Sequence, residues 1–264
     1  MTFGELFAGI GGFSLGLERA GMTCKWQVEI EPYARAVLKK HWPEVPKHED
    51  VRTFPPQGDY AVDLICGGFP CQDISSAGLR AGLAGKRSGL WYEFARIIGE
   101  LRPRYVIVEN VADLLIRGAG VVVGQLSSLG YDAEWHVIPA SAVGAPHRRE
   151  RVWIVAWDAN FGNERSQQRV CKSHRPDAGR VCSHVSNADN EGKPNVPVHG
   201  GARTGLQELA RGYEWWIAEP DVGRVADGVP SRVERLRCLG NAVVPQIVEV
   251  IGRAIIDRER RMNA

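Results

Sequence analysis

The sequence predicts an α/β fold, in which helices cover both faces of a mainly parallel sheet. Three observations lead to this prediction. Short runs rich in Val and Ile recur along residues 1–157, segments with a helical spacing of apolar residues separate them, and the apolar content falls sharply after residue 158. Strands that alternate with helices are typical of βαβ units, and such units build parallel sheets.

The expected elements follow one another in a regular order. Strands are predicted at 2–8, 25–30, 62–68, 104–110 and 151–157, and helices at 13–21, 32–42 and 88–103. Pro32 suits the first position of its helix, where the N–H that proline lacks would have no helical partner. The third helical pattern stops at Pro103.

Composition divides the chain into three parts. Residues 159–214 contain few bulky apolar side chains and much Gly, Asn, Ser, Arg and Pro, so they cannot extend the sheet. Residues 245–256 have the spacing of an amphipathic helix, which is expected to pack back on the first part. We therefore predict a large domain at 1–158, a small inserted region at 159–231 and a returning C-terminal segment at 232–264.

The overall composition argues against a membrane protein or a secreted protein. The chain has 264 residues and a formal net charge of +2, with no apolar run that approaches a membrane span and no basic leader before its apolar N-terminus. Six irregularly spaced cysteines in a chain of this size indicate reduced thiols, which suits a cytoplasmic protein. The near-neutral charge does not by itself indicate nucleic-acid binding, although 147–151 and 232–237 are locally basic.

A glycine-rich turn, LFAGIGGF at 6–13, joins the first predicted strand to the first helix. Such a turn would suit a dinucleotide, S-adenosylmethionine or merely a tight backbone bend. Glu29 and Glu31 follow about 20 residues on, where a carboxylate typically accepts hydrogen bonds from a ribose. Asp50 stands at a plausible third strand end. Together these carboxylates favour a cofactor that contains adenosine.

Two cysteines near the strand predicted at 62–68 differ in their setting. Cys66 lies inside the apolar run and is expected to be a small buried hydrophobe. Cys71 follows Pro70 beyond the carboxyl end of the strand, and open α/β sheets bind ligands at that edge. A thiolate is a strong nucleophile, so Cys71 is a candidate catalytic residue.

Charged residues also mark two further strands. Glu109 and Asn110 end the Val/Ile run at 104–110, where a buried charge is costly unless it is paired or used. Arg149 and Arg151 stand two residues apart where the strand at 151–157 begins, on one face of an extended segment. Two convergent guanidinium groups suggest a substrate that is anionic or carries a carbonyl.

Five motifs, in this order, resemble those of the DNA (cytosine-5)-methyltransferases: FAGIGG, GGFPCQDIS, ENV, RRER and GNAVVP. The resemblance covers about 1–157 and 235–256, and is greatest to the short enzymes of bacteria and their prophages. It implies a Rossmann-like fold that depends on S-adenosylmethionine, with a catalytic domain at 1–158 and target recognition at 159–231. The family usually has Gln in place of His147, and 226–241 stands where an arginine-rich motif normally follows the recognition region.

The resemblance also implies a role for individual residues. Cys71 would attack carbon 6 of cytosine, Glu109 would contact ring nitrogen 3 and the amino group, and Arg149 and Arg151 would steady the flipped base and the loop that carries the thiol. Phe7 would pack on the adenine of S-adenosylmethionine. The whole predicted cofactor site consists of Phe7, Ala8, Gly9, Ile10, Gly11, Glu29, Ile30, Asp50, Val51, Phe69, Leu90, Asn241 and Ala242.

The activity implied is transfer of a methyl group from S-adenosylmethionine to carbon 5 of a cytosine flipped out of double-stranded DNA. The expected enzyme is a monomer without a membrane segment, and a restriction endonuclease is a possible companion. An RNA cytosine methyltransferase is the alternative within the same chemistry. A nicotinamide dehydrogenase or a catalytically inactive DNA-binding relative would leave Cys71 and Glu109 without a purpose.

A metal site is not predicted. The inserted region contains a group of cysteines and histidines, but their spacing matches no common zinc finger, and such groups in polar loops are usually incidental. The residues concerned are Cys171, His174, Cys182 and His184.

Overall fold

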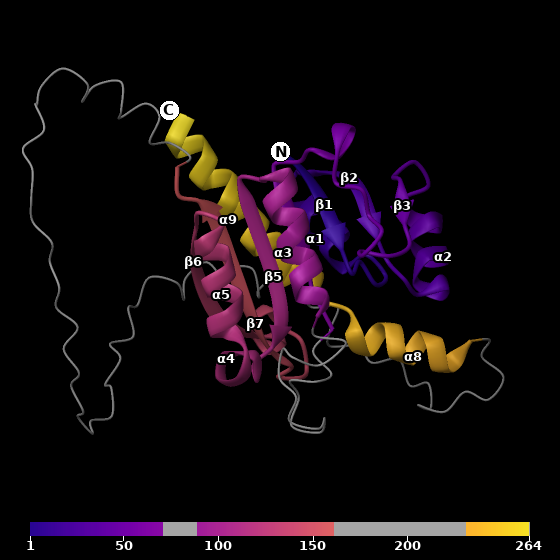
Figure 1. Ribbon diagram of the computed structural model, residues 1–264. Helices are drawn as coiled ribbons and strands as arrows, with labels where there is room; N and C mark the ends of the chain where they lie inside the picture. Colours follow the sequence, from indigo (N-terminus) through magenta and orange to yellow (C-terminus); the bar gives the residue numbers. More distant parts are fainter. Residues whose placement is uncertain (71–88, 161–230, 264) are drawn as a thin grey trace, which may run out of the picture.

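A computed structural model describes residues 1–70, 89–160 and 231–263 of the chain, and its centre is a sheet of seven strands (Figure 1). The order across the sheet is β3-β2-β1-β4-β5-β7-β6. The first five strands in the chain pair in parallel, whereas β7 is antiparallel to both of its neighbours. The strands are β1 (Thr2–Leu6), β2 (Thr23–Val28), β3 (Lys47–His48), β4 (Leu64–Gly67), β5 (Tyr105–Val111), β6 (Tyr131–Pro139) and β7 (Glu150–Asp158).

Helices cover both faces of this sheet, as the sequence predicts. They are α1 (Gly12–Arg19), α2 (Pro32–His41), α3 (Leu90–Leu101), α4 (Leu114–Arg117), α5 (Ala119–Ser128), α8 (Arg232–Asn241) and α9 (Pro245–Asn263). Short 3₁₀ turns lie at Gly58–Tyr60 and Ala140–Val143. The predicted elements are therefore present, with α9 longer than the expected 245–256.

Alternation of side chains along the strands produces a core on each face. On β5, Val106 and Val108 belong to the cluster that contains the buried residues of α3 and α5. Tyr105 and Ile107 point to the opposite face and join the cluster that contains residues of α1 and α9. The C-terminal helix therefore packs back against the first part of the chain, next to α1, as expected (Figure 1).

The order of the strands places two loops at one point of the sheet edge. After β1 the chain moves outward to β2 and β3, and then returns to form β4 on the other side of β1. The loops that follow β1 and β4 consequently leave the carboxyl edge side by side. Open α/β sheets bind their ligands at such a switch point.

Strand β6 was not predicted from the sequence. It pairs with β7 at the outer edge of the sheet, and most of its side chains are at least partly exposed. Asp132, Glu134 and His136 alternate with less polar residues, so the segment lacks the continuous Val/Ile run that marks the buried strands. Polar side chains of this kind also discourage an edge strand from pairing with another chain.

One described segment, Val233–Met262, contains a stretch that is long and apolar enough, by length and composition alone, to cross a membrane. No apolar run that approaches a membrane span is predicted from the sequence, and this stretch differs from that prediction. The segment is weak evidence for a span because a buried helix of a soluble protein passes the same test. Here Ile247, Val248 and Ile255 of α9 lie in the core beside α1.

Candidate active site

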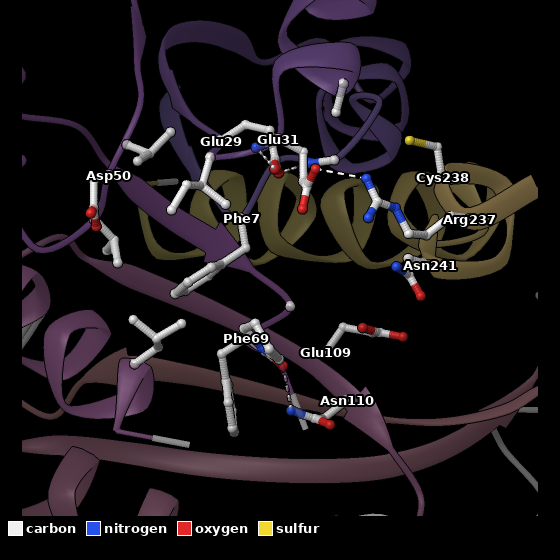
Figure 2. Close-up of a pocket in the computed structure, with 18 of the residues that line it drawn as sticks. Phe7, Glu29, Glu31, Asp50, Phe69, Glu109, Asn110, Arg237, Cys238 and Asn241 are labelled. Atoms are coloured by element: carbon white, nitrogen blue, oxygen red, sulfur yellow. Dashed lines mark hydrogen bonds and ion pairs between the residues drawn. The ribbon is translucent and has the colours of Figure 1, made fainter. Parts of the chain in front are cut away.

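A cavity of about 700 Å³ opens at the carboxyl edge of the sheet, where the loops after β1 and β4 meet (Figure 2). Its volume is in the range of small-molecule sites. The predicted site residues that line it are Phe7, Gly9, Glu29, Ile30, Asp50, Val51, Phe69, Leu90, Glu109, Arg151 and Asn241. Ala8, Ile10, Gly11, Arg149 and Ala242 do not belong to its described lining.

The glycine turn is fixed to the end of β2 by a carboxylate. The backbone N–H of Gly9 donates to Oε2 of Glu29 at 2.6 Å, and the N–H of Glu31 donates to Oε1 at 2.8 Å. Gly9 has a φ of 54°, which glycine adopts without strain. Gly11 has a φ of 86°, and a Cβ there would lie 2.4 Å from the ring of Trp42. The turn and Glu29 are therefore one preorganised unit.

An aromatic row from α3 supports one wall of the cavity. The ring of Phe7 lies 6.2 Å from that of Phe94, whose other neighbour is Trp91 at 5.5 Å. Phe69 lies 5.4 Å from Trp91. Phe7 and Phe69 therefore offer apolar surfaces, supported from behind by other rings, to a flat ligand.

Asp50 lies at the same end of the cavity, but it already has a partner. Arg52 donates to it through Nε at 2.9 Å and through Nη2 at 2.6 Å, and its backbone N–H contributes another bond. These hydrogen bonds lower the pKa of Asp50 below its ordinary value. A carboxylate has about four acceptor sites, and the hydrogen bonds from Arg52 already use most of those on Asp50. The contact of Asp50 with an adenine amino group stays a prediction.

The end of β5 brings together a carboxyl group and a guanidinium group. Nε of Arg151 lies 3.0 Å from Oε1 of Glu109, whose side chain is 10% exposed. Burial raises the pKa of Glu109 to about 7, while the positive charges of Arg151 and Arg149 oppose this rise. The neighbouring Gly68 makes room for the carboxyl group, since a Cβ there would lie 2.8 Å from Oε2. Glu109 therefore holds a proton more readily than an ordinary carboxyl group does.

Arg149 takes a different position from the one predicted. The sequence suggests that Arg149 and Arg151 share one face of an extended segment, but Arg149 has a φ of 35° and lies just before β7 begins. Its Nη2 donates to the carbonyl oxygen of Ala242 at 2.8 Å. Arg149 thus ties the link between α8 and α9 to the start of β7, while Arg151 forms an ion pair with Glu109.

Asn110 supports the loop that follows β4. Its side-chain amide donates to the carbonyl oxygen of Phe69 at 3.1 Å, and its Oδ1 accepts from the N–H of Val111 at 2.9 Å. The predicted nucleophile, Cys71, lies outside the described residues, as do the inserted segment 161–230 and the group Cys171, His174, Cys182 and His184. Cys66 is fully buried in β4, as predicted, and burial raises the pKa of its thiol.

Arg237 and Cys238 on α8 are among the cavity-lining residues that sequence reasoning missed. Nη2 of Arg237 lies 2.7 Å from Oε2 of Glu31. Asn241, four residues further on, lies on the same face of the helix. A signal was available, because a helical pattern through 232–241 would have placed Arg237 beside the predicted Asn241.

Another buried carboxyl group lies outside the described cavity lining. Glu5 of β1 is fully buried, and the hydroxyl and the backbone N–H of Ser14 both donate to its Oε2. Nε2 of Gln27 donates in turn to the Ser14 hydroxyl at 2.8 Å. Burial raises the pKa of Glu5 to about 8.

Comparison with known proteins identifies the family of the chain. A family model described as C-5 cytosine-specific DNA methylase matches residues 1–196. The chain belongs to this family. The result confirms the resemblance inferred from the motifs, and the fold is that of methyltransferases that depend on S-adenosylmethionine.

Individual relatives agree with the family. The type II methyltransferase M2.BsuMI of Bacillus subtilis (strain 168) is 32% identical over 237 residues, which are 86% of this chain and 54% of the relative. M.Eco47II of Escherichia coli is 41% identical over 160 residues, which are 58% of this chain and 38% of the relative. The chain spans about half the length of the curated relatives it matches.

Solved structures agree as well. A putative DNA modification methyltransferase encoded within an E. coli prophage has a TM-score of 0.52 and 27% identity, and the match covers 61% of this chain and 47% of that chain. The family's methyl donor is S-adenosylmethionine, and the described residues fit it. Glu29, which the glycine turn holds in place, is suited to a ribose diol, and the Phe7 ring is suited to an adenine face.

Proposed function

We propose that the protein methylates carbon 5 of cytosine in double-stranded DNA, with S-adenosylmethionine as the methyl donor. The observation that carries this proposal is the pair formed by Glu109 and Arg151 at the carboxyl end of β5. The pair lines the same cavity as the Glu29 unit that suits the donor. A substrate base and a donor can therefore meet in one cavity.

The chemistry depends on an attack at carbon 6. Carbon 5 of cytosine is too weakly nucleophilic to take a methyl group from a sulfonium, so the Cys71 thiolate first adds to carbon 6 and forms a covalent bond. Glu109 donates a hydrogen bond or a proton to nitrogen 3 and draws electron density from the ring, which leaves carbon 5 as an enamine carbon. S-adenosylmethionine, when bound, supplies the methyl group. Loss of the proton on carbon 5 and of the Cys71 thiolate then restores the aromatic ring.

The pKa of Glu109 suits this role. A carboxyl group with an ordinary pKa of 4.5 would be ionised at neutral pH, whereas burial raises that of Glu109 to about 7. General acids work best when their pKa lies near the operating pH. Arg151 holds the carboxyl group in place and keeps its pKa from rising further.

The remaining parts of the chain are assigned by the same proposal. Residues 1–158 form the catalytic, donor-binding domain, 159–231 form a small target-recognition region, and 232–264 return to the catalytic domain. The target base swings out of the duplex because its ring cannot be reached in the stack. The enzyme acts as a monomer in the cytoplasm of a bacterial or phage-infected cell, with a restriction endonuclease as a possible companion.

Expression in a host that lacks cytosine methylation tests this proposal. Bisulfite sequencing of the host DNA should reveal 5-methylcytosine in one short sequence context. A parallel assay with the purified protein, labelled S-adenosylmethionine and either duplex DNA or RNA should place the label in DNA. Label in RNA alone would overturn the choice of substrate, and label in neither would overturn the proposed activity.

A further inference from the structure

Three arginines belong to the described lining of the cavity, and they differ in how firmly a carboxylate partner holds each of them. Arg52 is held by Asp50 through several hydrogen bonds, and Arg151 is held by the buried Glu109. Arg237 is held less firmly, through an ion pair with Glu31. Its side chain is 52% exposed and that of Glu31 is 47% exposed, and ion pairs at such positions contribute little to stability.

Arg237 also keeps capacity for a second acceptor. Its contact with Glu31 runs through Nη2 at 2.7 Å, whereas a guanidinium group has five N–H donors in a planar fork. Such a fork matches the geometry of a carboxylate. A ligand carboxylate can therefore bind Arg237 without displacing Glu31 completely.

The position of Arg237 along the cavity indicates which part of a ligand it would meet. Figure 2 shows Phe7 and Asp50 toward one end, Glu29 in the middle, and Arg237 and Asn241 toward the other end. In the proposed function, the adenine lies on Phe7 and the ribose on Glu29. The amino-acid end of the donor then extends toward α8, where its carboxylate needs a cationic or N–H partner.

We propose that Arg237 binds the carboxylate of the amino-acid end of S-adenosylmethionine, with Asn241 on the same helical face as an additional donor. Arg237 therefore helps the enzyme distinguish this ligand from adenosyl compounds without a carboxylate. The inference rests on the proposed function. It concerns α8, which lies in the stretch 226–241 that stands where the arginine-rich family motif normally follows the recognition region.

The test measures binding rather than methylation. Calorimetry on the DNA-free protein should give the dissociation constants of S-adenosylmethionine and of decarboxylated S-adenosylmethionine, which differ only in the carboxylate. The wild-type protein should prefer the complete ligand by about tenfold, the typical gain from one charge-assisted hydrogen-bond pair. Arg237→Gln should bind both ligands about as weakly as the wild type binds the decarboxylated one.

Two further variants provide controls. Arg235→Gln removes an exposed charge from the same helix at a position outside the described cavity lining, so it should keep the preference of the wild type. Arg237→Lys keeps the charge but lacks the fork, so it should keep part of the preference. Thermal unfolding of each variant should coincide with that of the wild type, which shows that α8 remains folded.

The binding measurements distinguish a wrong role for Arg237 from a wrong proposed function. If the wild-type protein binds and uses S-adenosylmethionine but Arg237→Gln retains the tenfold preference, the role of Arg237 is wrong and the proposed function stands. An equal loss of affinity for both ligands in Arg237→Gln would also contradict the carboxylate contact. If the wild-type protein binds neither ligand, the proposed function fails together with the inference.

Discussion

Glu5 on β1 and Glu109 on β5 are both buried carboxyl groups with a raised pKa, yet their surroundings differ. Glu5 is enclosed beneath the glycine turn, where Ser14 donates to it and Gln27 extends the network. Glu109 lines the cavity and faces Arg151. Burial raises the pKa in both cases, to about 8 for Glu5 and about 7 for Glu109. A shifted pKa therefore identifies burial, and only access to a ligand identifies a candidate acid.

The largest expected effect is a loss of turnover, which should follow substitution of Glu109 but not of Glu5. Glu109→Gln keeps the shape but cannot supply the proton, so the turnover number should fall by about 100- to 10,000-fold. The affinity for S-adenosylmethionine, measured by equilibrium dialysis, should stay nearly unchanged. Glu5→Gln is the matched control and should retain turnover within a few-fold. An equal loss in both variants would mean that Glu109 acts through the fold.

The second effect concerns stability as a function of pH. The folded protein binds the Glu5 proton more tightly than the unfolded chain does, so Glu5 contributes stability below pH 4.5 that is lost as the pH rises to about 8. The size of this contribution is at most on the order of 5 kcal/mol. Glu109 contributes stability in the same direction, but its contribution is lost by about pH 7.

Denaturant unfolding between pH 5 and 9 checks this prediction. Glu5→Gln should remove most of the decline in the free energy of unfolding above pH 7, whereas Glu109→Gln should remove only a part that ends near pH 7. Identical pH profiles for the wild type and Glu5→Gln would show that Glu5 is ionised in the folded protein.

A smaller effect is expected at Glu29, which serves both regions because it holds the turn above Glu5 and faces the cavity. Glu29→Ala removes the acceptor for the Gly9 N–H and the proposed partner of the ribose. The dissociation constant for S-adenosylmethionine should rise by about 10- to 100-fold, since hydrogen bonds to charged groups contribute about 1.5–3 kcal/mol. Turnover at saturating donor should change less than in Glu109→Gln. The opposite pattern would assign Glu29 to the chemical step.

Sequence reasoning predicted the parallel part of the sheet well, because buried parallel strands leave strong signals in the sequence. A Val/Ile run that ends in Glu109, and a glycine turn followed by Glu29, specify where each side chain meets the sheet edge. The polar edge strand β6 lacks such a signal, and its pairing with β7 becomes visible only in the fold.

Other features depend on contacts between distant segments. Nothing local in the sequence indicates that Arg149 reaches the carbonyl of Ala242, 93 residues away, or that Arg237 meets Glu31, 206 residues away. Glu5 stands in a short strand whose pattern does not reveal that both of its faces are covered. These features are determined by tertiary packing, which local periodicity does not encode.

The central claim is that Cys71 forms a covalent bond with carbon 6 of cytosine while Glu109 assists. Duplex DNA that carries 5-fluorocytosine in the target sequence tests it directly, because fluorine cannot leave carbon 5 as a proton does. With S-adenosylmethionine present, the protein should form a stable adduct that denaturing electrophoresis detects. Cys71→Ala should abolish the adduct, and Cys66→Ala should retain it. An adduct that persists in Cys71→Ala, or none in the wild-type protein that methylates the same site, would contradict the account.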